Sequence, residues 1–182
     1  DSKEPFIEDI IFGVKTAIIR QESADRISRE LDTITSDGIS EQEVYEHAML
    51  INPSFETQHK AYYMHLGDDF SEGSFQDYYR MYETTALDIP QSLFTPYERG
   101  LLYVTSWDQK AGLNDEEVTE LLRQASGFTD SPIGISDVHY YPGELGYSIG
   151  EALEAALMAE GSSHKDLRFS SLGLLKMVYP LS

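Results

Sequence analysis

The chain has no cysteine among its 182 residues. This absence excludes disulfide bonds, thiol catalysis and metal sites built on cysteine. Basic residues are scarce as well: 13 Lys and Arg stand against 32 Asp and Glu, which gives a formal net charge of −19. Because phosphate contacts require Lys or Arg, we expect no binding to nucleic acid, and anionic membrane surfaces are disfavoured for the same reason.

Long apolar runs and the familiar catalytic motifs are also missing. No apolar stretch approaches the roughly 20 residues of a membrane span, so membrane insertion is not expected. There is no Gly-x-Ser-x-Gly elbow and no glycine-rich phosphate loop ahead of a lysine. We therefore expect no cofactor and assign no catalytic and no metal-binding residue. The start at Asp1 indicates either a processed mature chain or an excised segment, and many cytosolic proteins also lack cysteine. The localisation is therefore unknown, with a slight preference for an exported chain, periplasmic or extracellular.

The chain does have the material for a folded core, with 41% hydrophobic residues, 12 Tyr and 8 Phe. Its apolar residues recur mostly at helical spacing, as over residues 7–34. Further helix-start and helix-stop signals predict helices at 40–51, 53–66, 74–82, from 95, at 114–126 and at 148–160. We predict a mainly α fold of about seven or eight helices in one compact acidic domain, residues 1–182, with room for a small strand pair at 134–141 and 172–181.

The C-terminal part of the chain is predicted to supply much of the core. The helix from Ser148 carries apolar residues on one face, and the last sixteen residues contain no Asp or Glu. In so acidic a chain, this local absence of acidic residues indicates burial. The residues predicted to be buried are Ile149, Leu153, Ala156, Leu157, Leu172 and Leu175.

Two predicted helix starts concentrate the negative charge. One carries Glu41, Glu43 and Glu46, and the other carries Asp115, Glu116, Glu117 and Glu120. Acidic clusters of this kind attract basic proteins and accelerate the encounter. The tyrosine-rich segment with Tyr78, Tyr79 and Tyr82 would then supply the buried aromatic contacts that give affinity. The competing interpretation is a solvated face that only keeps the protein soluble.

Three partial motifs suggest carboxylate chemistry instead. The segment 17–23, Ala-Ile-Ile-Arg-Gln-Glu-Ser, resembles the helix end that carries the catalytic Glu of lytic transglycosylases and goose-type lysozymes, which would make Glu22 a general acid. The windows 32–43 and 68–79 resemble the scaffold of an EF-hand loop, but each lacks several oxygen ligands. Glu56 and His59 form a single Glu-x-x-His step, whereas a di-metal bundle needs two such steps.

The whole-chain charge is the strongest of these signals. We therefore expect a non-enzymatic interaction protein of the inhibitor or immunity type that binds a basic protein partner. The alternative is a carboxylate-dependent hydrolase using Glu22, or a divalent-cation-binding helix–loop–helix protein. The sequence indicates neither the identity of the partner nor the oligomeric state.

Overall fold

The structure is a computed structural model that describes residues 4–162 and 165–173. Within these residues the helices are α1 (Glu4–Ile34), α2 (Glu41–Ile51), α3 (Phe75–Tyr82), α4 (Asp115–Ser126) and α5 (Leu145–Glu160). The strands are β1 (Gln58–His65), β2 (Ser92–Tyr97), β3 (Gly100–Trp107), β4 (Ile133–Ile135) and β5 (Asp166–Arg168). Short 3-10 turns lie at Gly67–Asp69, Glu72–Ser74, Pro142–Glu144 and Phe169–Ser171.

The five strands form one mixed sheet in the order β2-β3-β1-β4-β5. Only β4 and β5 run parallel, while the other neighbouring pairs are antiparallel. With α3 after β1 and α4 after β3, the strands β1 to β4 trace a split β-α-β pattern. The strand β5 extends this sheet at the edge beside β4.

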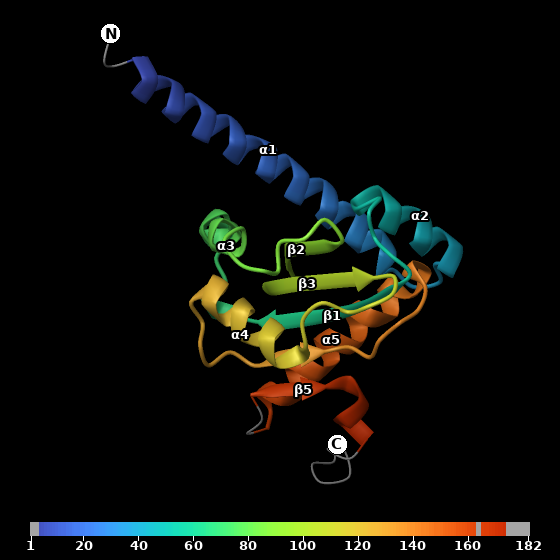
Figure 1. Ribbon diagram of the computed structural model, residues 1–182. Coiled ribbons are helices and arrows are strands. Elements are labelled where there is room, and N and C mark those ends of the chain that lie inside the picture. Colours follow the sequence, from blue (N-terminus) through green and yellow to red (C-terminus); the bar gives the residue numbers. More distant parts are fainter. Residues whose placement is uncertain (1–3, 163–164, 174–182) are drawn as a thin grey trace.

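Helices cover both faces of the sheet (Figure 1). Side chains alternate along a strand, so Ala61 and Tyr63 of β1 point to one face and Tyr62 and Met64 to the other. The first pair packs in a core with α1, α2 and α5. The second pair packs in a separate core with α3 and α4. The same alternation places His59 of β1 on the face covered by α1, α2 and α5, and Lys60 on the face covered by α3 and α4.

The prediction of a mainly α, all-helical fold is wrong, because the chain forms a five-stranded sheet with helices on both sides. The predicted helix 53–66 is in fact a turn followed by the central strand β1. Asn52 shapes that turn: its amide group donates to the carbonyls of Pro90 and Ser92, and its side-chain oxygen accepts from the backbone N–H of Ser54. Since β1 is covered on both faces, its sequence shows no alternation that would reveal a strand.

The helix predicted from residue 95 is also wrong, because this segment forms the β2–β3 hairpin. Glu98 and Arg99 occupy the turn with φ of +46° and +58°, and positive φ at both central residues is typical of a type I′ turn. Contacts from elsewhere hold this turn: the Tyr63 hydroxyl donates to the Glu98 carbonyl over 2.5 Å, and two backbone N–H groups donate to the Arg99 carbonyl. Pro96 is tolerated because β2 is an edge strand.

The predicted C-terminal core is confirmed in part. Ile149, Ala156 and Leu172 are buried, Leu153 is half-buried, and Leu157 is wrong because it is 47% exposed. Leu175 lies outside the described residues. Of the predicted strand pair, β4 covers only the beginning of 134–141, and most of 172–181 lies outside the described residues.

The N-terminal half of helix α1 projects beyond the body, and only its C-terminal half lies against the rest of the molecule (Figure 1). Leu31 and Ile34 are buried near its C-terminal end, whereas Phe6 and Phe12 near its start are 68% and 73% exposed. No helix among the described residues is long and apolar enough to cross a membrane.

Candidate functional site

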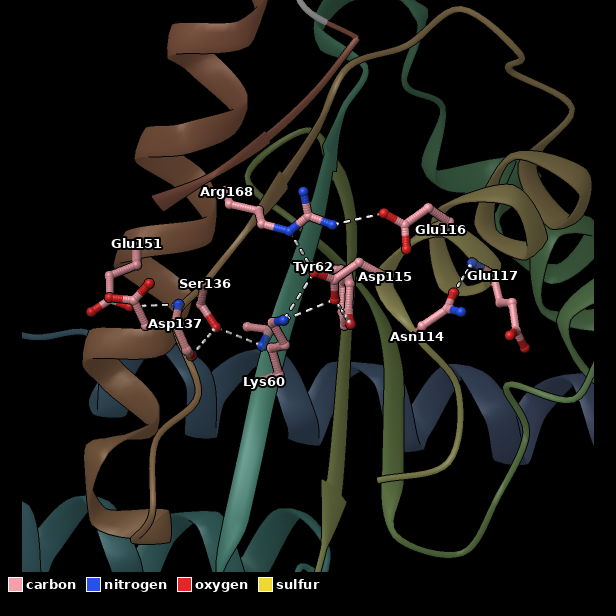
Figure 2. Close-up of polar contacts among 11 residues, drawn as sticks. Lys60, Tyr62, Asn114, Asp115, Glu116, Glu117, Ser136, Asp137, Glu151 and Arg168 are labelled. Carbon is pink, nitrogen blue, oxygen red and sulfur yellow. Dashed lines mark hydrogen bonds and ion pairs between the residues drawn. The ribbon is translucent and has the colours of Figure 1, made fainter. Parts of the chain in front are cut away.

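The most extensive polar network on the α3/α4 face of the sheet lies at the start of α4 (Figure 2). Asn114 caps this helix, since its side-chain oxygen accepts from the backbone N–H of Glu117 over 2.9 Å. Capping fixes Asp115 as the first helical residue. Lys60 and Tyr62 reach it from β1, because both stand on the strand face that looks toward α4.

Asp115 accepts hydrogen bonds from three side chains. The Lys60 Nζ lies 2.8 and 3.0 Å from its two carboxylate oxygens, and the Tyr62 hydroxyl donates over 2.6 Å. The Arg168 Nε donates over 2.8 Å, while the Arg168 Nη2 reaches Glu116 over 2.8 Å. One carboxylate thus joins the central strand β1, the helix α4 and the edge strand β5.

These contacts perturb the protonation of the groups involved. Burial alone would raise the pKa of Asp115, but the hydrogen bonds from Lys60, Tyr62 and Arg168 outweigh it and hold that pKa below its usual range. Burial, together with the bond to Asp115, raises the pKa of Tyr62 far above its ordinary value. Asp115 is therefore ionised and Tyr62 protonated at neutral pH.

This arrangement suits a structural tie better than catalysis. Four donor contacts from three side chains occupy both oxygens of Asp115, so neither is available to take a proton or bind a cation. The two cations and the two carboxylates, Asp115 and Glu116, also cancel in charge. The net negative charge at the start of α4 therefore comes from its next acidic residues, Glu117 and Glu120.

A cavity of about 310 Å³ opens beside this network. Its walls include Tyr103, Trp107, Leu113 and Val118, with Lys60 and Asp115 on the polar side. That volume is at the lower end for a small-molecule pocket and is sufficient for one or two side chains of a protein partner. No local sequence pattern indicates this cavity, since its lining comes from β1, β3, the start of α4 and separate loops that include Ile89 and Val138.

The structure separates the predicted acidic residues. Glu41, Glu43 and Glu46 are exposed on α2, and Glu117 and Glu120 are exposed on α4. Because α2 and α4 cover opposite faces of the sheet, the two groups do not form one patch. Asp115 and Glu116 are paired within the fold, so they contribute little to an outward negative field.

The predicted tyrosines face inward to different degrees. Tyr82 is 2% exposed and packs edge-on against Phe94, with ring centroids 4.6 Å apart. Tyr79 is half-buried beneath the guanidinium of Arg20, 5.1 Å from its ring centroid, and Tyr78 packs against Phe128. Tyr82 therefore belongs to the core, and only Tyr78 and Tyr79 retain partly exposed rings.

A second polar cluster lies on the other face of the sheet, between β1 and α5. His139 contacts Glu144 through Nδ1 at 2.6 Å and Glu151 through Nε2 at 3.0 Å. Its ring stacks on that of His59, whose Nε2 lies 2.6 Å from the Ser148 hydroxyl. The buried Nδ1 of His59 has no hydrogen-bond partner among the described residues.

The two histidines hold different charges because their surroundings differ. Burial, reinforced by the nearby charge of His139, lowers the pKa of His59 to about 3. Burial would also lower the pKa of His139, but its bonds to Glu151 and Glu144 outweigh this and raise it. His59 is thus neutral over the physiological range, while His139 is favoured in its charged form.

The partial catalytic and metal motifs are not assembled into sites. Glu22 is exposed on α1, and His59 lies in a strand, so Glu56 and His59 do not form a helical metal-binding step. Asp68 pairs with Arg99 across the hairpin turn. Among residues 4–162 and 165–173, no group of three or more His, Asp or Glu side chains has an arrangement that could hold a metal ion.

Sequence reasoning missed both polar clusters. In the first, Lys60 and Tyr62 come from a strand mistaken for a helix, and Arg168 is 52 or more residues from its partners. In the second, His59 comes from the same strand, whereas His139 lies only 5 and 12 residues from Glu144 and Glu151. The one usable signal was the run 58–65, where polar His59 and Lys60 precede two tyrosines. Read as a strand, this run predicts that His59 and Lys60 point to opposite faces.

Comparison with known proteins identifies no family: no protein-family model matches the chain, and no curated protein matches its sequence at a significant level. Function is therefore inferred from the side chains and their geometry.

Proposed function

We propose that the protein is a non-enzymatic interaction protein that binds a basic protein partner, as inhibitors and immunity proteins do. The observation that carries this proposal is the uneven pairing of charge. Among the described residues, six Lys and Arg side chains are already paired with acids of the same chain: Arg20, Lys60, Arg80, Arg99, Arg123 and Arg168. At the two helix starts, five exposed acids make no ion pair with any described residue: Glu41, Glu43, Glu46, Glu117 and Glu120.

We assign the docking face to the start of α4. There Asp115 and Glu116 line the cavity together with Trp107 and Leu113. Glu117 and Glu120 are exposed on the first turns of the same helix, outside the cavity lining. Unpaired carboxylates attract a basic partner over a distance, and an adjacent apolar pocket can bury an anchoring side chain of that partner. The start of α2 has comparable charge, so it provides an internal comparison.

The experiment begins with capture of binding proteins from a native lysate and elution with rising salt. Each eluted basic protein is then purified, and its association rate constant is measured by stopped flow. The double variant Glu117→Gln/Glu120→Gln should slow association at least threefold. The control Glu41→Gln/Glu46→Gln makes the same change in net charge on the opposite face, and its effect should be less than half as large.

Two outcomes would contradict this proposal. One is that no basic protein binds at low salt. The other is equal slowing by the two double variants, because a charge that serves only solubility has no preferred face. Circular dichroism of both variants should match the wild type, since these four side chains are exposed.

A further inference from the structure

The N-terminal half of α1 is an apolar surface without a partner among the described residues. Ile7, Ile11, Val14 and Ile18 are each between 48% and 55% exposed, in a helix that projects away from the body (Figure 1). Phe6 and Phe12 add to this exposure. Monomeric proteins rarely leave a contiguous apolar patch larger than about 300–600 Å², and such patches mark interaction sites.

The apolar residues follow the repeat of a helix–helix seam. Ile7, Ile11, Val14 and Ile18 are spaced by four, three and four residues, which places them in one stripe. At about 100° per residue, the stripe lies about 160° around the axis from the side on which Ile27, Leu31 and Ile34 meet the body. The body-facing side of α1 therefore does not continue into the stripe, and a separate surface is needed to cover it.

We propose that a second copy of this chain covers the stripe, with the two α1 helices packed antiparallel about a two-fold axis. Ile7 then lies level with Ile18 of the partner subunit, and Ile11 with Val14 of the partner subunit. Each layer joins one apolar residue to another, so the stripe is complementary to itself. Self-complementarity is what a two-fold symmetric dimer requires.

The charges beside the stripe set the direction of the pair. Glu8 and Lys15 occupy equivalent positions one heptad apart on the same flank, and both are exposed. Neither makes an ion pair with another described residue. In the antiparallel pair this flank meets its own copy, which brings Lys15 beside Glu8 of the partner subunit twice. In a parallel pair it would meet the opposite flank, where Ile10 lies and offers no charge.

The net charge of −19 also favours the antiparallel arrangement. The pair is centred between residues 12 and 13, and α1 first touches the body near Arg20, which pairs with Glu83. At 1.5 Å per residue the two acidic bodies begin about 22 Å apart, more than twice the screening length of about 8 Å at physiological salt. A parallel pair would instead place both acidic bodies at the same end.

The contact is small, which sets the expected affinity. Residues 7–18 span about 18 Å of helix, so the buried area is near or below the lower bound of about 1,200 Å² for stable interfaces. We expect a dissociation constant of about 10–100 μM at physiological salt. The dimer is independent of the binding face proposed at α4, which lies on the body.

Sedimentation equilibrium between about 5 and 500 μM tests the dimer. The wild-type mass should rise from one to two chains over this range. The double variant Ile11→Glu/Val14→Glu should remain monomeric throughout. The control Phe12→Glu introduces one glutamate at a more exposed apolar residue about 130° away from the stripe, 73% exposed against 48% for Ile11 and 55% for Val14. It should shift the dissociation constant less than threefold.

The antiparallel direction of the two α1 helices is tested by exchanging the charges of Glu8 and Lys15 and by measuring a distance between spin labels. Glu8→Lys or Lys15→Glu alone should weaken dimerisation about threefold to tenfold, and the double exchange Glu8→Lys/Lys15→Glu should restore it. Since the chain has no cysteine, Asp25→Cys introduces a single site for a spin label. Pulsed electron resonance on the labelled dimer should then give a distance of about 40 Å, from the 1.5 Å rise per residue.

Several results would overturn the proposal. A wild-type protein that stays monomeric at 500 μM excludes the second copy as the occupant of the stripe. A dimer that survives Ile11→Glu/Val14→Glu, or that Phe12→Glu disrupts equally, does not use the stripe. A label distance below about 25 Å, or no rescue by the double exchange, excludes the antiparallel pair. Each variant should keep the wild-type melting temperature of the monomer, because its side chains are exposed.

Discussion

The hydrogen bonds that Asp115 accepts from Lys60, Tyr62 and Arg168 predict that Asp115→Ala lowers the free energy of unfolding. Its side chain is only 11% exposed, and that of Lys60 is 18% exposed. Removing the carboxylate leaves the Lys60 ammonium and the Tyr62 hydroxyl without their common acceptor, at about 1–3 kcal/mol for each mostly buried group. The 48%-exposed Arg168 keeps Glu116 and water, so its loss is small. We expect the free energy of unfolding to fall by about 3 kcal/mol in total.

Urea unfolding followed by circular dichroism measures this change at neutral pH. A loss of about 3 kcal/mol corresponds to a melting temperature about 6–12 °C lower for a domain of this size. Two variants serve as controls. Asp115→Asn keeps the volume and one acceptor, so it should lose less than Asp115→Ala. Glu116→Gln breaks only an exposed pair, and it should stay within about 0.5 kcal/mol of the wild type.

The pH dependence gives a second check on the same tie. Because the folded-state pKa of Asp115 is lowered, its contribution is complete above the ordinary value of 3.8 and is lost as pH falls through the folded pKa. The stability gap between wild type and Asp115→Ala should therefore be constant from pH 5 to 8 and shrink below about pH 4. An Asp115→Ala variant within about 0.5 kcal/mol of the wild type, or a gap that widens in acid, would refute this reasoning.

Three further predictions follow from the packing and the histidine cluster. The free energy of unfolding should be largest near pH 6.5. Below this pH it should fall by up to about 1.4 kcal/mol per pH unit, because His59 becomes protonated in the unfolded chain but stays neutral in the fold, where its pKa is about 3. Above this pH the stabilising contribution of protonated His139, whose pKa is raised in the fold, is lost. Glu151→Gln should flatten the alkaline side of this curve, and an unchanged curve would contradict the assigned pairing. In urea unfolding, Gly134→Ala of β4 should cost about 3 kcal/mol or more, because a Cβ would lie 1.9 Å from the Ala152 carbonyl oxygen. The control Gly150→Ala, at an exposed position of helix α5 with nothing within 4 Å, should instead gain up to about 1 kcal/mol. Glu98→Asn/Arg99→Gly should stabilise the fold by about 1–2 kcal/mol and so raise the melting temperature, because Asn and Gly tolerate the positive φ of this turn better than Glu and Arg. A lower melting temperature would show that the turn depends instead on the ion pair between Arg99 and Asp68.

The sequence predicted the helices well where a cap and an amphipathic period coincide. Ser40 and Asn114 do cap α2 and α4, each accepting a hydrogen bond from the backbone N–H three residues later. The central strand β1 escaped prediction because helices bury both of its faces. The β2–β3 turn escaped because Glu-Arg carries no local turn signal, and its conformation is held by Tyr63 from another strand.

The candidate site was predictable only in its charge. The acidic start of α4 is a local feature of the sequence, so Glu117 and Glu120 could be named in advance. Arg168, which pairs with both Asp115 and Glu116, lies 52 or more residues away from them in the sequence. Tyr82 is buried partly by Phe94, which belongs to strand β2. Pairing of this kind is decided by the sheet order, which no local pattern encodes.

The salt dependence of association tests the central claim most directly. The association rate constants of the wild-type protein and of Glu117→Gln/Glu120→Gln with the proposed basic partner are measured between about 20 and 300 mM NaCl. The account predicts at least a tenfold fall for the wild type over this range and a shallower slope for the variant, because screening removes the attraction that these two carboxylates exert. A rate constant that ignores salt, or identical slopes for the two proteins, would contradict a steering role for the start of α4.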